Sequence, residues 1–320
     1  MLITNNQAMS KPSVPDLLNQ NLLSPDLLSQ DFLTWIKAKQ AHIESVLALT
    51  LPPANLIPQT LHSAMRYSAL GGGKRIRALL CYATAELCNT ETQIADAAAS
   101  AVELIHAYSL VHDDMPCMDD DDLRRGKPSC HKQFDDATAL LVGDALQTLA
   151  FEVLSAPQLC ENANQQINMI NILAKAAGSN GMAGGQAIDL SAVGVALTQH
   201  ELETMHQLKT GALIQAAVLL SAHGSNEHIA AVSIYAKNIG LAFQVIDDIL
   251  DVEADTHTLG KTAGKDANSN KPTYVTILGL ADAKKHAKQL YETAIDALAP
   301  FGDNAQRLRA LANFITQRSF

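Results

Sequence analysis

The stretch VHDDMPCMDDDDLRRGKP, residues 111–128, places six aspartates within ten positions, followed by two arginines and a lysine. Carboxylates at this density are the oxygen ligands of a hard cation such as Mg²⁺, although a solvated acidic loop has the same composition. Asp113 and Asp119 lie six residues apart, which on a regular helix is about 120° off a shared face. Pro116 interrupts the helix between them, and this break would let the two carboxylates converge.

A second acidic cluster ends another apolar segment, FQVIDDILDV at 243–252. Asp247 and Asp251 stand at i and i+4 and share a helix face, where two acids repel unless something neutralises them. Two such clusters, each at the tip of an apolar helix, predict opposite walls of one cavity. Neither has His or Cys at metal-ligand spacing, so an all-oxygen site for Mg²⁺ is favoured, completed by water and phosphate oxygens.

Three basic groups indicate what such a metal would hold. They are Lys74, Arg75 and Arg77; Arg124, Arg125 and Lys127; and Lys261, Lys265 and Lys271. The first group follows three glycines, which let backbone N–H groups approach an anion, and a helix start would add its dipole. Arginine forks match phosphate oxygens in pairs. The combination predicts two diphosphates, one held through metal and one directly; a solvated basic face is the alternative, most of all for Arg75, Lys127 and Lys265.

The remainder of the chain predicts the helices that position these groups. Of the 320 residues 48% are hydrophobic and only 4% aromatic, a mix that favours packed helices over sheets. Apolar residues recur three and four apart between breakers such as GGGK and AGSNGMAGG. Thr198 and Glu201 form a capping-box pattern at the start of one segment. We expect an all-α single domain of about ten or more helices over 29–320, after a loose leader at 1–28.

Composition also limits the partners and the location. The net charge of −10 argues against a nucleic-acid partner. The five cysteines are scattered without a C-x-x-C pair, which indicates reduced thiols in the cytoplasm. No signal peptide and no long uncharged apolar run are found, so no membrane span is expected. Ile76 and Asp255 occupy positions where the two nucleotide-binding glycine fingerprints require glycine.

The order and spacing of the motifs resemble the trans-prenyl diphosphate synthase family, and within it the bacterial enzymes that make farnesyl diphosphate. The resemblance covers roughly residues 30–320. It rests on LGGGKRIRALL, ELIHAYSLVHDDMPCMDDDDLRRGKPSCH, GMAGGQAIDL, LKTGALI, FQVIDDILDV and LGKTAGKDANSNKPTYV. The resemblance implies an all-α bundle around a large central cavity, usually as a homodimer, with about three Mg²⁺ ions per active site and Mn²⁺ as a possible substitute.

The resemblance also implies roles for individual residues. Asp113 and Asp119 would ligate two Mg²⁺ ions and Asp247 a third, within a metal group that also takes in Asp114 and Asp251. The allylic diphosphate would be held by Arg124, Lys209 and Lys261. Isopentenyl diphosphate would be held by Lys74, Arg77, His106 and Arg125. Lys271 completes the substrate-binding set, and Thr210 and Gln244 would face the cleaving bond and the cation. The remaining acids of the first run, Asp120, Asp121 and Asp122, are expected to be solvated or supporting.

Two positions on the helix before the first motif bear on substrate and product. His106 lies two turns before Asp113 on the same face, although a lone histidine on an apolar helix is otherwise a core or rim residue. Tyr108 lies five residues before Asp113, about 7.5 Å down the helix. The resemblance implies that its ring forms the floor under the growing tail, with space beside Ser109, and that the product has fifteen carbons. An ordinary packed tyrosine is the alternative.

The implied reaction is the Mg²⁺-dependent head-to-tail condensation of isopentenyl diphosphate with dimethylallyl and geranyl diphosphate to (E,E)-farnesyl diphosphate. The segment 260–272 would act as a lid that excludes water. A geranyl or geranylgeranyl diphosphate synthase is an alternative within the family. A non-catalytic subunit of a heteromeric synthase would be expected to lack one acidic motif, and both are present. A terpene cyclase would not need the GGGKRIR group, and an acidic scaffold would not explain the cations.

Overall fold

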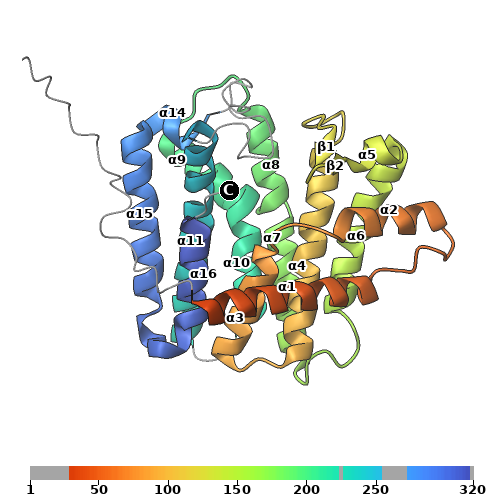
Figure 1. Cartoon of the computed structure of the whole chain (residues 1–320), viewed down its shortest axis with the longest axis horizontal. Coiled ribbons are helices and arrows are strands. Elements are labelled where there is room, and N and C mark those ends of the chain that lie inside the picture. The colour runs from red at the N-terminus through yellow and green to blue at the C-terminus, as the bar shows by residue number, and fades with distance from the viewer. Residues whose placement is uncertain (1–28, 223–225, 254–271, 318–320) are drawn as a thin grey trace, which may run out of the picture.

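The structure is a computed structural model, and it describes residues 29–222, 226–253 and 272–317. These residues form a helical bundle, as predicted, with one two-stranded antiparallel hairpin (Figure 1). The elements are α1 (Gln30–Thr50), α2 (Gln59–Ala69), α3 (Ile76–Cys88), α4 (Thr92–Asp113), β1 (Leu123–Arg124), β2 (Lys127–Pro128), α5 (Cys130–Gln133), α6 (Asp136–Leu154), α7 (Ala163–Ala177), α8 (Met182–Ser191), α9 (Gln199–His206), η2 (Gln207–Gly211), α10 (Ala212–Leu219), α11 (Asn226–Glu253), α14 (Tyr274–Leu278), α15 (Leu280–Ala297), η3 (Ala299–Ala305) and α16 (Gln306–Thr316).

Helix α4 is the central helix of the bundle. Its alanine-rich sequence is buried on nearly all sides, and it packs against α3 and α6. Small side chains such as Ala98 and Ala101, both with no exposed surface, let the neighbouring helices approach closely. The all-round apolar segments of the sequence are therefore central helices, as the periodicity indicated.

The two acidic motifs reach the same end of the bundle. Helix α4 ends at Asp113, one residue before a loop that contains Pro116, and the first motif continues into the β1–β2 hairpin. Helix α11 ends at Glu253, just after Asp251. Figure 1 shows the β1–β2 hairpin and α14, the next described helix after α11, at this one end. The fold thus brings together clusters that lie more than 120 residues apart in the chain.

Local signals in the sequence agree with the observed helix ends. Ser29 caps α1 by accepting a hydrogen bond from the amide of Phe32 at 3.2 Å. The capping box of Thr198 and Glu201 is present at the start of α9, with both of its hydrogen bonds. The division into a leader at 1–28 and a domain at 29–320 stays a prediction, because the leader lies outside the described residues.

Helix length and composition alone would permit membrane spans in this chain. Three described helices are long and apolar enough to cross a bilayer: Thr92–Asp113, Asp136–Leu154 and Glu227–Glu253. In the most apolar 18-residue stretch of each helix, the fold buries 78% of the first, 33% of the second and 50% of the third. The expectation of no span therefore stays a prediction.

All five cysteines are free thiols, as predicted.

Candidate active site

A cavity of about 460 Å³ opens between α3, α4, α6, α8 and η2. These elements come from widely separated parts of the sequence. The predicted site residues that line this cavity are Arg77, His106, Tyr108, Ser109, Asp113, Lys209 and Thr210. The structure therefore brings together four of the ten predicted substrate-binding residues, both chain-length residues and one predicted metal ligand around a single space large enough for a small apolar ligand.

The first acidic motif folds back on itself after Asp113. The amide of Asp119 donates to the carbonyl of Asp113 at 2.8 Å, so the break at Pro116 returns the chain to the helix end. Burial raises the pKa of Asp113 to about 6; the Lys209 ammonium opposes this rise, and the Asp119 carboxylate adds to it. The two carboxylates therefore act on one another, as the predicted convergence requires.

This raised pKa predicts acid-sensitive metal binding. A metal needs the ionised carboxylate, and Asp113 takes up a proton as the pH falls through about 6, whereas an ordinary aspartate stays ionised to about pH 4. The apparent Mg²⁺ affinity is expected to fall about tenfold between pH 7 and pH 5. Calorimetric titration of Mg²⁺ at several pH values measures this affinity. An affinity that does not change between pH 7 and pH 5 would contradict the prediction.

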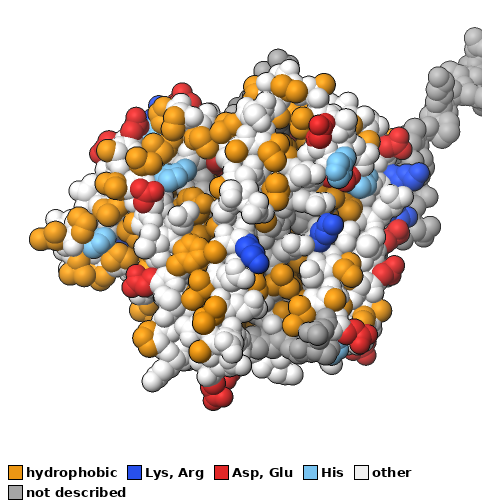
Figure 2. All heavy atoms as spheres, turned by 180° about the vertical axis from the view of Figure 1, so that it is seen from behind, with side chains coloured by type: hydrophobic (Ala, Val, Ile, Leu, Met, Phe, Trp, Pro, Cys, Tyr) orange, Lys and Arg blue, Asp and Glu red, His pale blue; other side chains and the backbone are white. Residues whose placement is uncertain are grey.

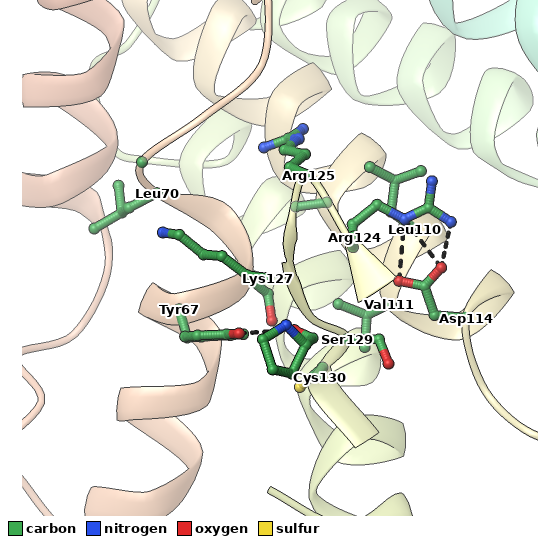
Figure 3. A pocket seen from close by; sticks show the side chains of 14 residues that line it. Tyr67, Leu70, Leu110, Val111, Asp114, Arg124, Arg125, Lys127, Ser129 and Cys130 are labelled. Carbon is green, nitrogen blue, oxygen red and sulfur yellow. Dashed lines mark hydrogen bonds and ion pairs between the residues drawn. The ribbon is translucent and has the colours of Figure 1, made fainter. Parts of the chain in front are cut away.

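Asp114 does not lie beside Asp113 as a second free ligand. Its carboxylate is buried and accepts from Nε of Arg124 at 3.0 and 3.1 Å, and Nη2 of the same arginine makes a further short contact (Figure 3). Both oxygens of Asp114 are thus used to hold Arg124. Asp114 therefore positions a cation, which the sequence could not show because both partners stood in one charged run, and its membership of the metal group stays a prediction.

The two adjacent arginines point in different directions. The β1–β2 hairpin turns at Arg125 and Gly126, which both have positive φ, 53° and 73°, as a two-residue hairpin turn requires. The side chain of Arg125 leaves the turn on the other side from Arg124 and donates to the carbonyl of Gly72 at 2.9 Å (Figure 3). This divergence supports the prediction that Arg124 and Arg125 face two different diphosphates.

The glycine loop before α3 has no space for side chains beside Arg125. A Cβ atom at Gly73, whose φ is 90°, would lie 3.0 Å from the Arg125 guanidinium carbon, and one at Gly72 would lie 3.2 Å from its Cδ. Lys74, the next residue, has an exposed side chain. The loop therefore packs Arg125 against its backbone and leaves Lys74 accessible to an anion.

His106 is neutral in this setting. Burial, and then the charges of Arg77, Arg125, Arg75 and Arg124, lower its pKa well below the ordinary value. A neutral imidazole offers one N–H donor and no net charge. His106 can therefore contribute a hydrogen bond to an anion in the cavity, while the neighbouring arginines contribute the charge.

The second wall comes from the end of α11. Asp251 is buried, and its Oδ1 has no hydrogen-bond partner in the described part of the chain. Burial lowers the pKa of Arg77, and the Asp247 carboxylate is among the charges that oppose this effect, so Asp247 lies within electrostatic reach of α3. Asp248 instead accepts from the amide of Tyr274 at 2.7 Å and so anchors α14 to α11. Burial lowers the pKa of His206 to about 4, and the side chain of Gln244 lies close enough to oppose this effect.

Two predicted lysines cannot be placed. Lys261 and Lys271, with all of the expected lid except Pro272, lie outside the described residues. Their assignment to the diphosphates stays a prediction from the resemblance.

Lys209 sits on a kink that the glycine after it indicated. Residues Gln207–Gly211 form a π-helical turn, a feature often found at functional sites. Gly185 of α8 packs directly on this turn, since a Cβ there would lie 2.1 Å from the amide nitrogen of Lys209. The Lys209 ammonium pairs with Asp189 Oδ2 at 2.6 Å, and the Asp189 side chain is only 8% exposed.

Two residues of α8 belong to the site although the sequence reading assigned them no role. Asp189 fixes Lys209, and Gln186 lines the cavity with both amide atoms buried and without a hydrogen-bond partner in the described structure. They stand at i and i+3 within GMAGGQAIDL, a motif that the resemblance already included. The sequence feature that could have indicated their role is the presence of two polar residues on one face of an otherwise apolar, glycine-rich helix.

Loss of the Asp189 carboxylate is expected to reduce turnover. In Asp189→Asn the Lys209 ammonium remains but is no longer aimed, so kcat should fall about tenfold with a smaller change in the KM of the allylic diphosphate. Steady-state kinetics measure this, with Asp296→Asn on the exposed face of α15 as the matched control. An unchanged kcat would show that Asp189 does not position Lys209 for the reaction.

The donor set fits a hard divalent cation. The carboxylates of Asp113, Asp119 and Asp247 supply oxygen only. The buried Oδ1 of Asp251, which has no hydrogen-bond partner among the described residues, is an acceptor that a cation shell would satisfy. Asp120 and Asp122, which follow the first motif, lie near His131 of α5, with ligand atoms within 4.8 Å of one another. Two of these are exposed, and Asp122 pairs with Lys132 at 2.9 Å, so this group differs from the predicted ligands.

Comparison with known proteins decides the family. The polyprenyl synthetase family matches residues 58–308 of the chain. The chain belongs to this family. It is 46% identical over 297 residues to farnesyl diphosphate synthase of Escherichia coli K12, covering 90% of this chain and 99% of that protein. It is 43% identical over 307 residues to the chloroplastic heterodimeric geranylgeranyl pyrophosphate synthase large subunit 1 of Arabidopsis thaliana, covering 93% and 82% of the two chains.

A solved structure of the polyprenyl synthetase family has the same fold. The apo FPP/GFPP synthase of Zymomonas mobilis matches with a TM-score of 0.81 at 40% identity, covering 89% of this chain and 99% of that one. The predicted family and the all-α fold are therefore confirmed. The chain is a prenyltransferase, and its family is metal-dependent.

Proposed function

We propose that the chain catalyses the head-to-tail condensation of isopentenyl diphosphate with dimethylallyl and then geranyl diphosphate, to give (E,E)-farnesyl diphosphate. One observation supports this most: a single cavity has acid and cation groups at Asp113, Lys209 and Arg77 and is lined further down by the ring of Tyr108. Such a cavity suits a molecule with a diphosphate head and an apolar tail of limited length.

In the proposed reaction the cations act on the leaving group. The allylic C–O bond breaks, and Lys209 and Arg124 stabilise the charge that grows on the departing pyrophosphate. Mg²⁺, about three ions held by Asp113, Asp119, Asp247 and Asp251, would supply further charge stabilisation, and Mn²⁺ has the same ligand preferences.

The second diphosphate would be held directly by the other basic group. Arg77 and Arg125 supply charge, Lys74 an accessible ammonium, and neutral His106 an N–H donor. The isopentenyl double bond then attacks the allylic cation, and the proton lost in forming the new double bond goes to the departed pyrophosphate. Thr210 and Gln244 would face the breaking bond, and Lys261 and Lys271 would add to the diphosphate contacts.

The test is Mg²⁺-dependent incorporation of labelled isopentenyl diphosphate, with dimethylallyl or geranyl diphosphate as starter and the product carbon count as the readout. Fifteen carbons from both starters is the expected result. The likeness to the Arabidopsis geranylgeranyl pyrophosphate synthase subunit makes a geranylgeranyl diphosphate synthase the second candidate, and a twenty-carbon product would favour it. No incorporation would favour a non-catalytic subunit and would overturn the proposal.

We also propose that the chain works as a homodimer in the cytoplasm, without a membrane span or nucleic-acid partner. Helix α6 supports the dimer, because it is strongly apolar yet leaves Leu140 and Leu141 49% and 54% exposed. Hydrophobic side chains are also spread over the face shown in Figure 2. A second copy covering α6 would bury the two leucines.

A charge on α6 is therefore expected to separate the subunits. Leu140→Glu/Leu141→Glu would place two carboxylates in the interface, and light scattering should show a dimer for the wild type and a monomer for the variant. The matched control is Ile167→Glu on α7, a residue with 63% exposure, which should leave the mass unchanged. A monomeric wild type would contradict the proposal.

A further inference from the structure

Arg75 is a buried residue, although the sequence placed it among cations for which diphosphate binding or a solvated basic face was expected. It is 5% exposed and adopts a positive φ of 53° immediately before α3. Its guanidinium donates to Glu44 Oε1 from Nε and Nη2 at 2.8 and 2.6 Å, to Glu103 Oε2 from Nη1 at 2.9 Å, and to the carbonyl of Ala69 from Nη2 at 2.7 Å. These bonds use four of the five N–H donors of Arg75, and its side chain is only 2% exposed, so it does not contact an anion in the cavity.

The same two carboxylates hold both ends of the glycine loop. Glu44 Oε2 accepts from the amide of Gly71 at 3.1 Å, at the start of the loop. Glu103 Oε1 accepts from the amide of Ala78 at 3.2 Å, in the first turn of α3. Arg75 joins the two carboxylates, so the loop of 71–75 is tied at both ends to α1 and α4.

Glu103 also lies where it balances the cations of the site. It is 3% exposed, one helical turn before His106 on α4. Arg77, Arg125 and Arg75 all interact with its charge, which opposes the effect of burial on each of them. A buried carboxylate shared by three arginines lets them remain charged and close together before an anion arrives.

We propose that Glu103, acting through Arg75 together with Glu44, is a positioning residue that preorganises the glycine loop for isopentenyl diphosphate. The inference rests on the proposed function, which gives Lys74, Arg77 and His106 to that diphosphate. Glu103 itself touches Arg75 and the α3 amide. Its effect should therefore reach one substrate selectively, because the loop contributes Lys74 and leads into the first turn of α3, which carries Arg77. The allylic diphosphate is assigned to Arg124 and Lys209.

The test is the change in KM for each substrate in Glu103→Gln. The glutamine keeps the shape and can still accept from Ala78, but it loses the charged bond to Arg75. We expect the KM of isopentenyl diphosphate to rise about tenfold and the KM of geranyl diphosphate to stay within about twofold. In an Arg75→Gln background the same substitution should add little, because the partner is already absent.

A matched control separates positioning from loss of stability. Arg66 donates to the carbonyls of Ala48 and Leu51 at 3.0 Å each and ties α2 to the end of α1 without any carboxylate. Arg66→Lys should lower Tm without separating the two KM values. If Glu103→Gln does not fold, Glu44→Gln serves instead, with an expected rise of about threefold in the KM of isopentenyl diphosphate alone.

The outcomes distinguish this inference from the proposed function. Suppose that the wild type forms product. If the two KM values of Glu103→Gln then change equally, or its loss of activity follows the loss in Tm alone, only the positioning role is overturned. A wild type that incorporates no isopentenyl diphosphate overturns the function on which the inference rests.

Discussion

Asp113→Asn and Asp247→Asn are each expected to lower kcat by about three orders of magnitude or more. Each substitution removes a carboxylate from one wall of the site, and with it the charge that would hold a metal against the leaving pyrophosphate. Asparagine keeps the shape and removes the charge, so the fold is expected to survive. For Asp113, whose ionised form is disfavoured by burial, Tm should stay level or rise when no metal is present.

The measurement is kcat over a range of Mg²⁺ concentrations, with thermal unfolding in parallel. Asp120→Asn is the matched control, because Asp120 belongs to the same acidic run but has an exposed side chain. We expect it to remain within about threefold of the wild type. Near-wild-type turnover of Asp247→Asn at saturating Mg²⁺ would show that the second wall is not part of the metal site.

Tyr108→Ala is expected to extend the product beyond fifteen carbons. Tyr108 is buried, with 8% exposure, and its ring lines the cavity from α4. It packs edge-on against His112 with ring centroids 5.8 Å apart, and it hydrogen-bonds to Gln147 of α6. Removing the ring opens the space between α4 and α6 below the growing product chain. In the wild type that product chain meets the packed tyrosine ring.

The readout is the carbon count of the products formed from geranyl diphosphate with excess isopentenyl diphosphate. Tyr108→Phe is the control: it keeps the ring, loses the hydroxyl, and should still stop at fifteen carbons. Ser109, the next residue, donates a hydrogen bond from its hydroxyl to the carbonyl of His106 at 2.9 Å. Its small side chain is therefore held against the helix and does not close the cavity in place of the tyrosine ring. An unchanged product spectrum in Tyr108→Ala would mean that the tyrosine is only a packed core residue.

The features that the sequence predicted well depend on local patterns. Helical periodicity, the break at Pro116 and the capping box of Thr198 need only residues close in the chain, and the structure confirms each. The two acidic motifs were expected on facing walls because each ended an apolar helix. Their arrival at one end of the bundle follows from α4 and α11 running in the same direction there.

The features that the sequence could not predict depend on which distant groups meet. Arg75 resembled its cationic neighbours, and only the fold shows Glu44 and Glu103 beside it. Asp114 resembled its acidic neighbours until Arg124 was found folded back onto it. Asp189 finds Lys209 across a helix contact that Gly185 makes possible. In each case the partner, rather than the residue type, decides between a structural and a substrate-binding role.

Anomalous diffraction from crystals soaked with Mn²⁺ and a non-cleavable allylic diphosphate analogue locates the metal site. We expect Mn²⁺ bound by Asp113 and Asp119 on one side and by Asp247 on the other, with the diphosphate between them beside Lys209. Mn²⁺ at Asp120, Asp122 and His131 instead, with the two walls free of metal, would contradict this expectation.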